Sequence, residues 1–196
     1  MKKLITTLAA GAAFAALASP AAAAPTAGGR VEAIVGWDHF SIGIDDFGFE
    51  DENLSSDGIV FGIGAGYDFA VGTNASIGID VEASESTADF DITDGTDSAE
   101  ISAGRDLYAG ARVTFGVSES ANLYLKAGYT NLRVSGRTEI DGDIEEDSAN
   151  ADGLRGGAGI QFAVGTNAYV GAEYRYSNYE GAVSRHQAVA SLGFRF

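Results

Sequence analysis

The stretch "IVFGIGAGYDFAVGTNASIGIDVE", residues 59–82, decides the fold. In its first half, large apolar side chains at odd positions, such as Ile59, Phe61 and Ile63, alternate with small or charged residues at even positions. The same alternation resumes from Ala75. A period of two is the period of a β-strand with one apolar face. The residues 72–74, Gly-Thr-Asn, favour a tight turn, so the stretch is predicted to be a β-hairpin.

The seven residues "FAVGTNA" inside this hairpin occur again at residues 162–168, between two further alternating segments. Similar segments begin near Val31, Leu107, Leu123 and Ala188. The sequence therefore predicts eight strands of roughly 10–14 residues, long enough to cross a bilayer when tilted. Short turns are predicted near residues 72–74, 118–120 and 165–167. Long polar loops are predicted near residues 41–57, 84–100 and 135–152, and a shorter one near 177–184.

The N-terminal residues differ in character from the rest of the chain. Lys2 and Lys3 precede an alanine-rich apolar run, and small residues end it. This pattern is typical of a secretory signal peptide, with cleavage predicted after Ala23. A transmembrane anchor is the alternative, but the run is shorter than the ~20 apolar residues that a spanning helix needs. The predicted organisation is a signal peptide over residues 1–23 and one β-barrel domain over residues 24–196.

The overall composition excludes several classes of function. The chain has 196 residues, with 28 acidic and 12 basic side chains and a formal net charge of −16, which argues against nucleic-acid binding. It has no cysteine, so disulfide and thiolate chemistry are excluded. No cofactor is predicted.

Alternation alone does not say whether the apolar face is turned to a core or to lipid, because a soluble barrel and a membrane barrel share the same period. The placement of charged residues indicates which of the two surrounds the apolar face. No Lys, Arg, Asp or Glu lies on the apolar face in the central part of the eight segments, where Lys or Arg at the bilayer midplane costs about 2–4 kcal/mol. The opposite face carries the charges: Glu32, Asp38, Asp68, Asp80, Glu82, Asp106, Arg112, Lys126, Arg155, Glu173, Arg175 and Arg195.

Aromatic residues support the membrane interpretation. They fall on the apolar face near both ends of the predicted strands, as the two interfacial girdles of a membrane barrel require. The predicted girdle residues are Trp37, Phe69, Phe115, Tyr129, Phe162, Tyr174, Tyr176 and Phe196. The predicted fold class is therefore all-β, a membrane-spanning, eight-stranded, antiparallel up-and-down β-barrel that follows an N-terminal signal peptide.

The chain ends in "LGFRF", with Leu192, Phe194 and Phe196 on one face. This ending resembles the C-terminal signature of bacterial outer-membrane barrels, which implies recognition by the barrel-assembly machinery. With the eight strands, the signal peptide and the acidic loops, the mature chain resembles the small opacity-type and OmpA/OmpX-type barrels of the porin superfamily. The resemblance implies a monomer in the outer membrane of a Gram-negative bacterium, in contact with outer-membrane lipid and lipopolysaccharide.

The inward charges fall at similar heights above the short turns, which predicts a charge layer inside the barrel. The predicted members are Asp80, Glu82, Arg112, Lys126, Glu173 and Arg175, with Asp80–Arg112 as the expected pair. Buried ions need partners, because removing one partner is costly. Two interpretations remain open: the layer plugs the barrel, or it lines a narrow gated pore.

The predicted outer loops carry most of the acid, which indicates a solvated, repulsive surface. Divalent-cation binding is the alternative, with clustered oxygens from Asp141, Asp143, Glu145, Glu146 and Asp147 as weak candidates that lack the full twelve-residue calcium-loop pattern.

Catalysis is a further alternative, because some eight-stranded outer-membrane barrels are lipid A deacylases that use Ser, His and an acid. His39 and Ser41 have a His-x-Ser spacing, and His186 lies near the same rim. The sequence shows no acidic partner on that outward face, so we predict that the protein is not an enzyme. The predicted function is structural, in envelope integrity or in surface interaction of an adhesin-like kind through acidic loops. The alternatives are a narrow porin-like channel and a lipid A-modifying enzyme.

Overall fold

The computed structural model describes residues 27–43, 53–94, 97–140 and 143–196. The predicted signal peptide, residues 1–23, lies outside these residues. Every described element is a strand or a turn, and the described residues contain no helix long and apolar enough to cross a membrane.

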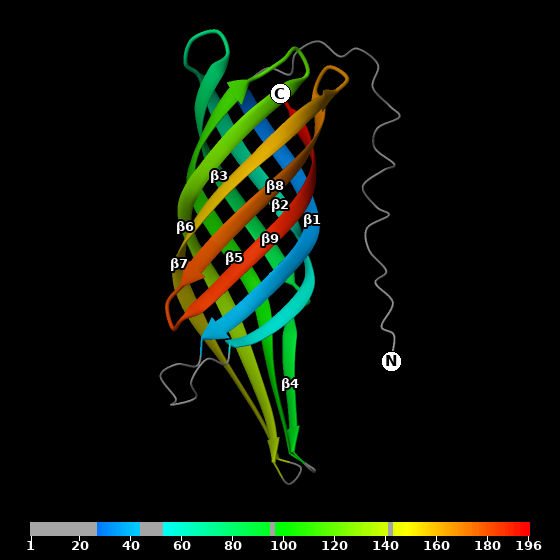
Figure 1. Ribbon diagram of the computed structural model, residues 1–196, viewed down its shortest axis with the longest axis vertical. Helices are drawn as coiled ribbons and strands as arrows, with labels where there is room; N and C mark the ends of the chain where they lie inside the picture. The colour runs from blue at the N-terminus through cyan, green and yellow to red at the C-terminus, as the bar shows by residue number, and fades with distance from the viewer. Residues whose placement is uncertain (1–26, 44–52, 95–96, 141–142) are drawn as a thin grey trace.

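Within the described residues, nine β-strands form one closed sheet (Figure 1). They are β1 (Gly28–Gly43), β2 (Asn53–Ala70), β3 (Ala75–Ser86), β4 (Asp89–Asp94), β5 (Asp97–Gly116), β6 (Ala121–Ile140), β7 (Asp143–Val164), β8 (Ala168–Tyr179) and β9 (Val183–Arg195). Strands that follow one another in the chain pair antiparallel, except that β3 does not pair with β4. The pairings β1–β9 and β3–β5 close the ring. The predicted antiparallel up-and-down barrel is confirmed.

The ninth strand does not add a ninth position to the barrel wall. β3 pairs with residues 106–115 of β5, and β4 continues along β5 by pairing with residues 97–102. The two therefore follow one path, interrupted at Thr87 and Ala88, where the backbone amide of Thr87 bonds to the carbonyl of Ile59 in β2. The wall has the predicted eight strands, and the third is broken at its outer end.

Two of the predicted long loops are largely strand, which corrects that part of the sequence analysis. β6 and β7 pair from Ala121–Phe162 out to Ile140–Asp143, and β5 pairs with β6 as far as Ser98–Glu139. These strands extend well beyond the barrel, at the lower end in Figure 1. Polar residues are tolerated there because backbone pairing continues while both faces of the ribbon meet water. The predicted loop near residues 41–57 lies partly outside the described residues.

The repeated "FAVGTNA" segments form two short turns between β2 and β3 and between β7 and β8. Gly72 and Gly165 have φ angles of 81° and 86°, in the left-handed region that glycine adopts without strain. Both turns lie at the same end of the barrel as the C-terminus (Figure 1). Short turns are periplasmic in barrels of this kind, so the extended strands β4–β7 point out of the cell.

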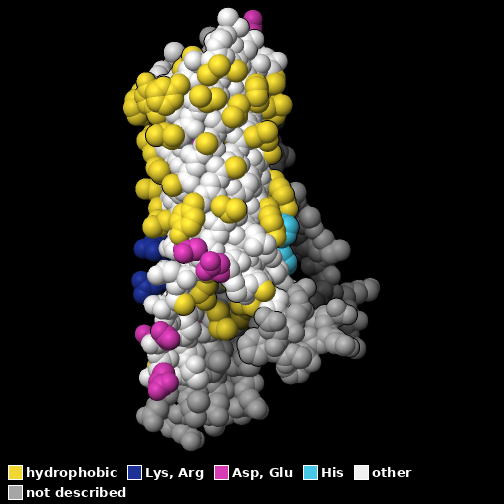
Figure 2. Space-filling view, turned by 90° about the vertical axis from the view of Figure 1, so that its left-hand side faces the viewer, with side chains coloured by type: hydrophobic (Ala, Val, Ile, Leu, Met, Phe, Trp, Pro, Cys, Tyr) yellow, Lys and Arg dark blue, Asp and Glu magenta, His cyan; other side chains and the backbone are white. Residues whose placement is uncertain are grey.

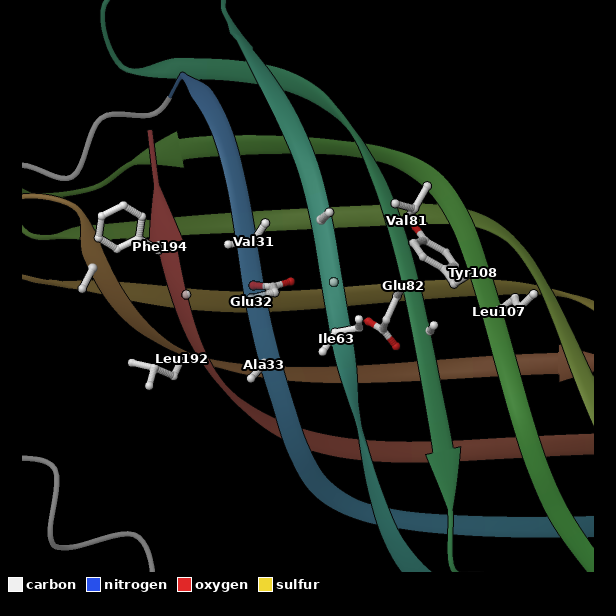
Figure 3. Close-up of a pocket in the computed structure, with 15 residues that line it drawn as sticks. Val31, Glu32, Ala33, Ile63, Val81, Glu82, Leu107, Tyr108, Leu192 and Phe194 are labelled. Atoms are coloured by element: carbon white, nitrogen blue, oxygen red, sulfur yellow. The ribbon is translucent and has the colours of Figure 1, made fainter.

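Burial is inverted relative to a soluble protein. Large apolar side chains of every wall strand are exposed on the outer surface, with Ile63 at 68% and Leu154 at 71%. On the face shown in Figure 2 they form a broad apolar band. Their sequence neighbours face the lumen: along β1 and β3, Glu32 and Glu82 alternate with Val31, Ala33 and Val81 (Figure 3). A water-soluble fold does not leave this much contiguous apolar surface exposed. The band is the lipid-facing surface.

Candidate functional site

The interior of the barrel is filled by ionic side chains. The largest side chains that are almost completely buried include six arginines. Among the described residues, the buried basic side chains are Arg30, Arg112, Lys126, Arg155, Arg175, Arg185 and Arg195, and the buried acidic ones are Asp38, Asp68, Asp80, Glu82, Asp106 and Glu173. Nearly equal numbers of opposite charges share the lumen, as buried ions require. They form three layers along the barrel axis.

The periplasmic layer is centred on two aspartates. Asp68 Oδ2 lies 2.7 Å from Arg30 Nη1 and 2.8 Å from Arg195 Nη1. Asp80 contacts Arg30 closely, whereas Arg112 Nη1 is 4.0 Å from Asp80 Oδ2. The predicted Asp80–Arg112 pair is thus present only at the limit of an ion pair, and Arg30 is the main partner of Asp80.

Glu82 is the centre of the middle layer. Its two carboxylate oxygens accept hydrogen bonds from Arg175 Nη1 at 2.6 and 2.7 Å. Lys126 Nζ lies 3.4 Å from Glu82 Oε2, and Arg155 Nη1 lies 3.4 Å from Glu82 Oε1. Lys126 also contacts Glu173 at 2.8 Å, and the Tyr124 hydroxyl donates to that glutamate at 2.7 Å. Strands β3, β6, β7 and β8 are therefore linked across the lumen, at a position where water is largely excluded.

Asp106 organises the outer layer. It contacts Arg155 and accepts from Arg185 Nη1 at 2.8 Å, from the Tyr179 hydroxyl at 2.7 Å and from the Thr130 hydroxyl at 2.6 Å. Arg185 also forms an ion pair with Asp38, its second carboxylate partner. A carboxylate with this many donors has its lone pairs satisfied, so the layer is a connected network and not an isolated ion.

An apolar cluster lies beyond the outer ionic layer, toward the extracellular mouth. Its buried members are Phe40, Ala88, Phe90, Ala103, Leu132, Tyr179 and Val183. The rings of Phe40 and Phe90 lie 5.5 Å apart, centroid to centroid. Ala88 lies between β3 and β4, and the other side chains come from β1, β4, β5, β6, β8 and β9, so the cluster draws on most of the circumference of the barrel. We call this group the apolar plug.

The predicted girdle residues all lie on the outer wall. Their exposed fractions range from 38% for Tyr176 to 74% for Phe196, and they occupy both edges of the apolar band. Leu192 and Phe194, in the predicted assembly signature, are exposed on the same wall.

The two histidines lie opposite each other at the outer rim, where His39 of β1 pairs in register with His186 of β9. His39 Nδ1 is 2.8 Å from Asp57 Oδ1, and His186 Nδ1 is 2.6 Å from the Tyr174 hydroxyl. The expectation that His39 has no acidic partner on this face is wrong. Asp57 falls in a predicted loop, but it belongs to β2 and pairs in register with His39. Among the described residues, no serine hydroxyl bonds to either histidine.

Residues 6–196 match the model of a family described as the outer membrane protein beta-barrel domain. The chain belongs to this family. The barrel accordingly lies in the bacterial outer membrane, and its apolar band faces lipid.

Solved structures agree with this fold. The barrel is similar to Ail, the attachment invasion locus protein of Yersinia pestis, with a TM-score of 0.55 and 16% identity over 86% of this chain and 99% of that one. It is also similar to Neisserial surface protein A, with a TM-score of 0.58 and 18% identity over 86% of this chain and 97% of that one. No curated protein sequence matches the chain.

The six residues of the predicted charge layer all face the interior of the barrel, where they lie in the periplasmic and middle layers. Arg30 and Arg185 were missed, although each forms close ion pairs with two aspartates. The signal was available, because both have the inward parity of their strands. The predicted strands begin after Arg30 and after Arg185, so the predicted charge layer contains neither residue.

The candidate metal ligands do not form a described site. Among the described residues, no group of three or more His, Asp or Glu side chains is placed to hold a metal ion. Asp141 lies outside the described residues, as does the side chain of Asp143. Glu145, Glu146 and Asp147 are exposed on the outer extension of β7.

Asp152, on the outer part of β7, has its pKa lowered by hydrogen bonds from the Tyr129 hydroxyl and the Asn131 amide, in that order of effect. A lowered pKa in the folded state means that this interaction stabilises the fold above the ordinary pKa of aspartate and is lost as pH falls through the folded value. We expect Tyr129→Phe to raise the pKa of Asp152, measured by NMR titration, and Tyr176→Phe to leave it unchanged. An unaltered pKa in Tyr129→Phe would contradict the assignment.

Proposed function

We propose that the protein is a closed outer-membrane barrel that makes contacts at the cell surface and does not conduct solutes. The observation that carries this proposal is the filling of the lumen by the three ionic layers and the apolar plug. A solute would have to break the contacts of Glu82 and Asp106 and then displace Phe40 and Leu132. An eight-stranded barrel has an interior just wide enough for its side chains, which supports the same conclusion.

Conductance of the refolded protein in planar bilayers tests the closed barrel against the alternative of a narrow porin-like channel. We expect no steady channels, with insertion verified on the same bilayers by antibody detection of the extended strands. Large, steady conductance steps from the unmodified protein would contradict the proposal of a closed barrel.

The outer extension of β4–β7 supports a role in surface contact. Among the described residues, it presents exposed carboxylates such as Glu100, Glu145, Glu146 and Asp147. The name of the similar Yersinia protein associates its barrel with attachment, and one structure of that protein contains the heparin analogue sucrose octasulfate, which is a polyanion. A chain with a net charge of −16 repels polyanions. We therefore propose a partner with a basic surface.

Binding of the refolded barrel to polylysine-coated and to uncoated surfaces tests this charge preference. We expect binding to the coated surface only, weakened by salt, and weakened by the triple change Glu145→Gln, Glu146→Gln and Asp147→Asn. Neutralising Glu119, which is exposed at a periplasmic turn, serves as the control. Equal binding by the triple variant and the unmodified protein would show that this face is not the contact surface.

The proposed role is not catalytic. His39 and Asp57 form a pair of the kind that activates a nucleophile, but no described serine bonds to His39. Mass analysis of lipid A from cells with and without the protein distinguishes the alternatives, because loss of an acyl chain that depends on the protein would establish an enzyme.

A further inference from the structure

A row of four outward side chains crosses the seam where the first and last strands of the barrel meet. The register places His39 of β1 directly opposite Asp57 of β2 on one side and opposite His186 of β9 on the other. His186 in turn lies opposite Tyr176 of β8. The chain has two histidines and no cysteine, so both of the side chains that transition metals prefer as ligands lie in this row.

Each imidazole ring is held on the side that faces away from the other histidine. His39 Nδ1 lies 2.8 Å from Asp57 Oδ1, on the β2 side, and His186 Nδ1 lies 2.6 Å from the Tyr174 hydroxyl, on the β8 side. Because Nδ1 and the edge formed by Cδ2 and Nε2 are on opposite sides of an imidazole ring, these contacts turn both Nε2 atoms toward the seam between β1 and β9. Directly opposite residues of an antiparallel pair have Cβ atoms about 4.5–5.5 Å apart. Among the described residues, no hydrogen bond engages either Nε2 atom.

The contact with Asp57 also decides which nitrogen of His39 carries the proton. An ionised carboxylate only accepts hydrogen bonds, so a neutral His39 has its proton on Nδ1 and presents a lone pair at Nε2. Histidines that bind metals usually donate their other ring N–H to a carboxylate or another acceptor, which orients the ring and raises the basicity of the ligand. The Tyr174 hydroxyl oxygen can accept the Nδ1 proton of His186 in the same way. Both rings are therefore arranged as metal ligands.

The chemistry of the ligands and their position indicate which ions fit. Imidazole nitrogen suits zinc, copper and nickel, whereas calcium and magnesium prefer oxygen ligands. No third His, Asp or Glu of the described residues completes the group, so water occupies the remaining coordination positions. In Figure 2 the cyan histidine side chains lie at the extracellular edge of the apolar band. An ion can therefore reach the pair from the water outside the cell.

We propose that His39 and His186 bind one divalent transition-metal ion of the zinc or copper kind through their Nε2 atoms, and that Asp57 positions His39 for this. The ion links β1 to β9, the two strands that close the barrel. Because the ligands come from opposite ends of the chain and meet only in the folded barrel, the ion binds the folded state preferentially and stabilises it. This inference is independent of the proposed surface contact and of the closed lumen.

Quenching of the single tryptophan by Cu²⁺ tests the site, because the rings of Trp37 and His39 are stacked with their centroids 5.6 Å apart. Untagged protein is refolded in phosphatidylcholine vesicles and titrated with Cu²⁺. We expect saturable quenching that is reversed by Zn²⁺, which does not itself quench, and that is not reversed by Ca²⁺. His186→Ala removes one ligand and leaves His39 beside Trp37, so we expect the affinity for Cu²⁺ to fall at least about tenfold. His186→Gln, which keeps a polar partner for Tyr174, is a second variant with the same expected loss.

The role of Asp57 is tested by Asp57→Asn, which is expected to lower the affinity for Cu²⁺ about tenfold. Asp152→Asn is the matched control, because it removes an exposed carboxylate whose hydrogen bonds come from Tyr129 and Asn131 and not from a histidine. We expect no change in affinity there. Circular dichroism verifies that each variant refolds.

Three results would overturn the paired site. Absence of saturable quenching in the unmodified protein would show that no ion binds beside Trp37. An unchanged affinity for Cu²⁺ in both His186→Ala and His186→Gln would show that His39 binds the ion without His186. Equal losses in Asp57→Asn and Asp152→Asn would show that general negative charge, and not the positioning of His39, attracts the ion.

Discussion

Replacing Glu82 with glutamine is expected to lower the free energy of unfolding by about 3–5 kcal/mol. The substitution keeps the size of the side chain but removes the charge that faces Arg175, Arg155 and Lys126. These cations would remain buried with one carboxylate fewer, and an uncompensated buried charge is strongly destabilising. Urea unfolding in lipid vesicles, followed by the fluorescence of the single tryptophan, measures the effect.

Glu85→Gln is the matched control, because Glu85 lies on the same strand but is exposed. We expect a change of less than about 0.5 kcal/mol there. If both variants unfold at the same urea concentration as the unmodified protein, the middle ionic layer contributes nothing to stability, and its role as a structural plug is wrong.

Replacing Leu125 with arginine has the second largest expected effect. Leu125 lies on the outer wall of β6, midway between the periplasmic turn and Tyr129, and is 58% exposed. If lipid covers this surface, an arginine there costs about 2–4 kcal/mol because its charge enters hydrocarbon. The same unfolding measurement detects this change.

Thr138→Arg is its control, since Thr138 is exposed on the same strand in the extracellular extension. An arginine that faces water at that position is expected to alter stability by no more than about 0.5 kcal/mol. Equal, small effects at Leu125 and Thr138 would mean that water, and not lipid, surrounds Leu125.

The barrel was predictable because its decisive signal is local and repeated. Alternation along residues 59–82 fixed one hairpin, and the position of charges relative to Phe69 and Phe115 decided which face meets lipid. The extended strands were not predictable in the same way. Outside the membrane neither face of β6 or β7 needs to be apolar, so residues 135–152 lose the alternation that identifies a strand and resemble a loop.

The contacts of the candidate sites required the three-dimensional register. Parity places Asp80 and Arg112 on the inner face, but it does not say that Arg30 reaches Asp80 from a strand two positions away across the sheet. Likewise, the register of β5 against β6 passes directly from Ala103–Val134 to Asp106–Leu132, and this β-bulge leaves no clear mark in the sequence. It changes the inward parity of β5 and so places Ala103 in the apolar plug.

The central claim is that apolar side chains face lipid while ionic side chains fill the interior. Trp37 is the single tryptophan, exposed on the outer wall near the extracellular rim, so its fluorescence in vesicles tests this claim directly. We predict strong quenching by lipids brominated on the acyl chain close to the headgroup, weaker quenching by lipids brominated at the chain end, and little quenching by iodide. Trp37 emission that is insensitive to every brominated lipid would contradict the account.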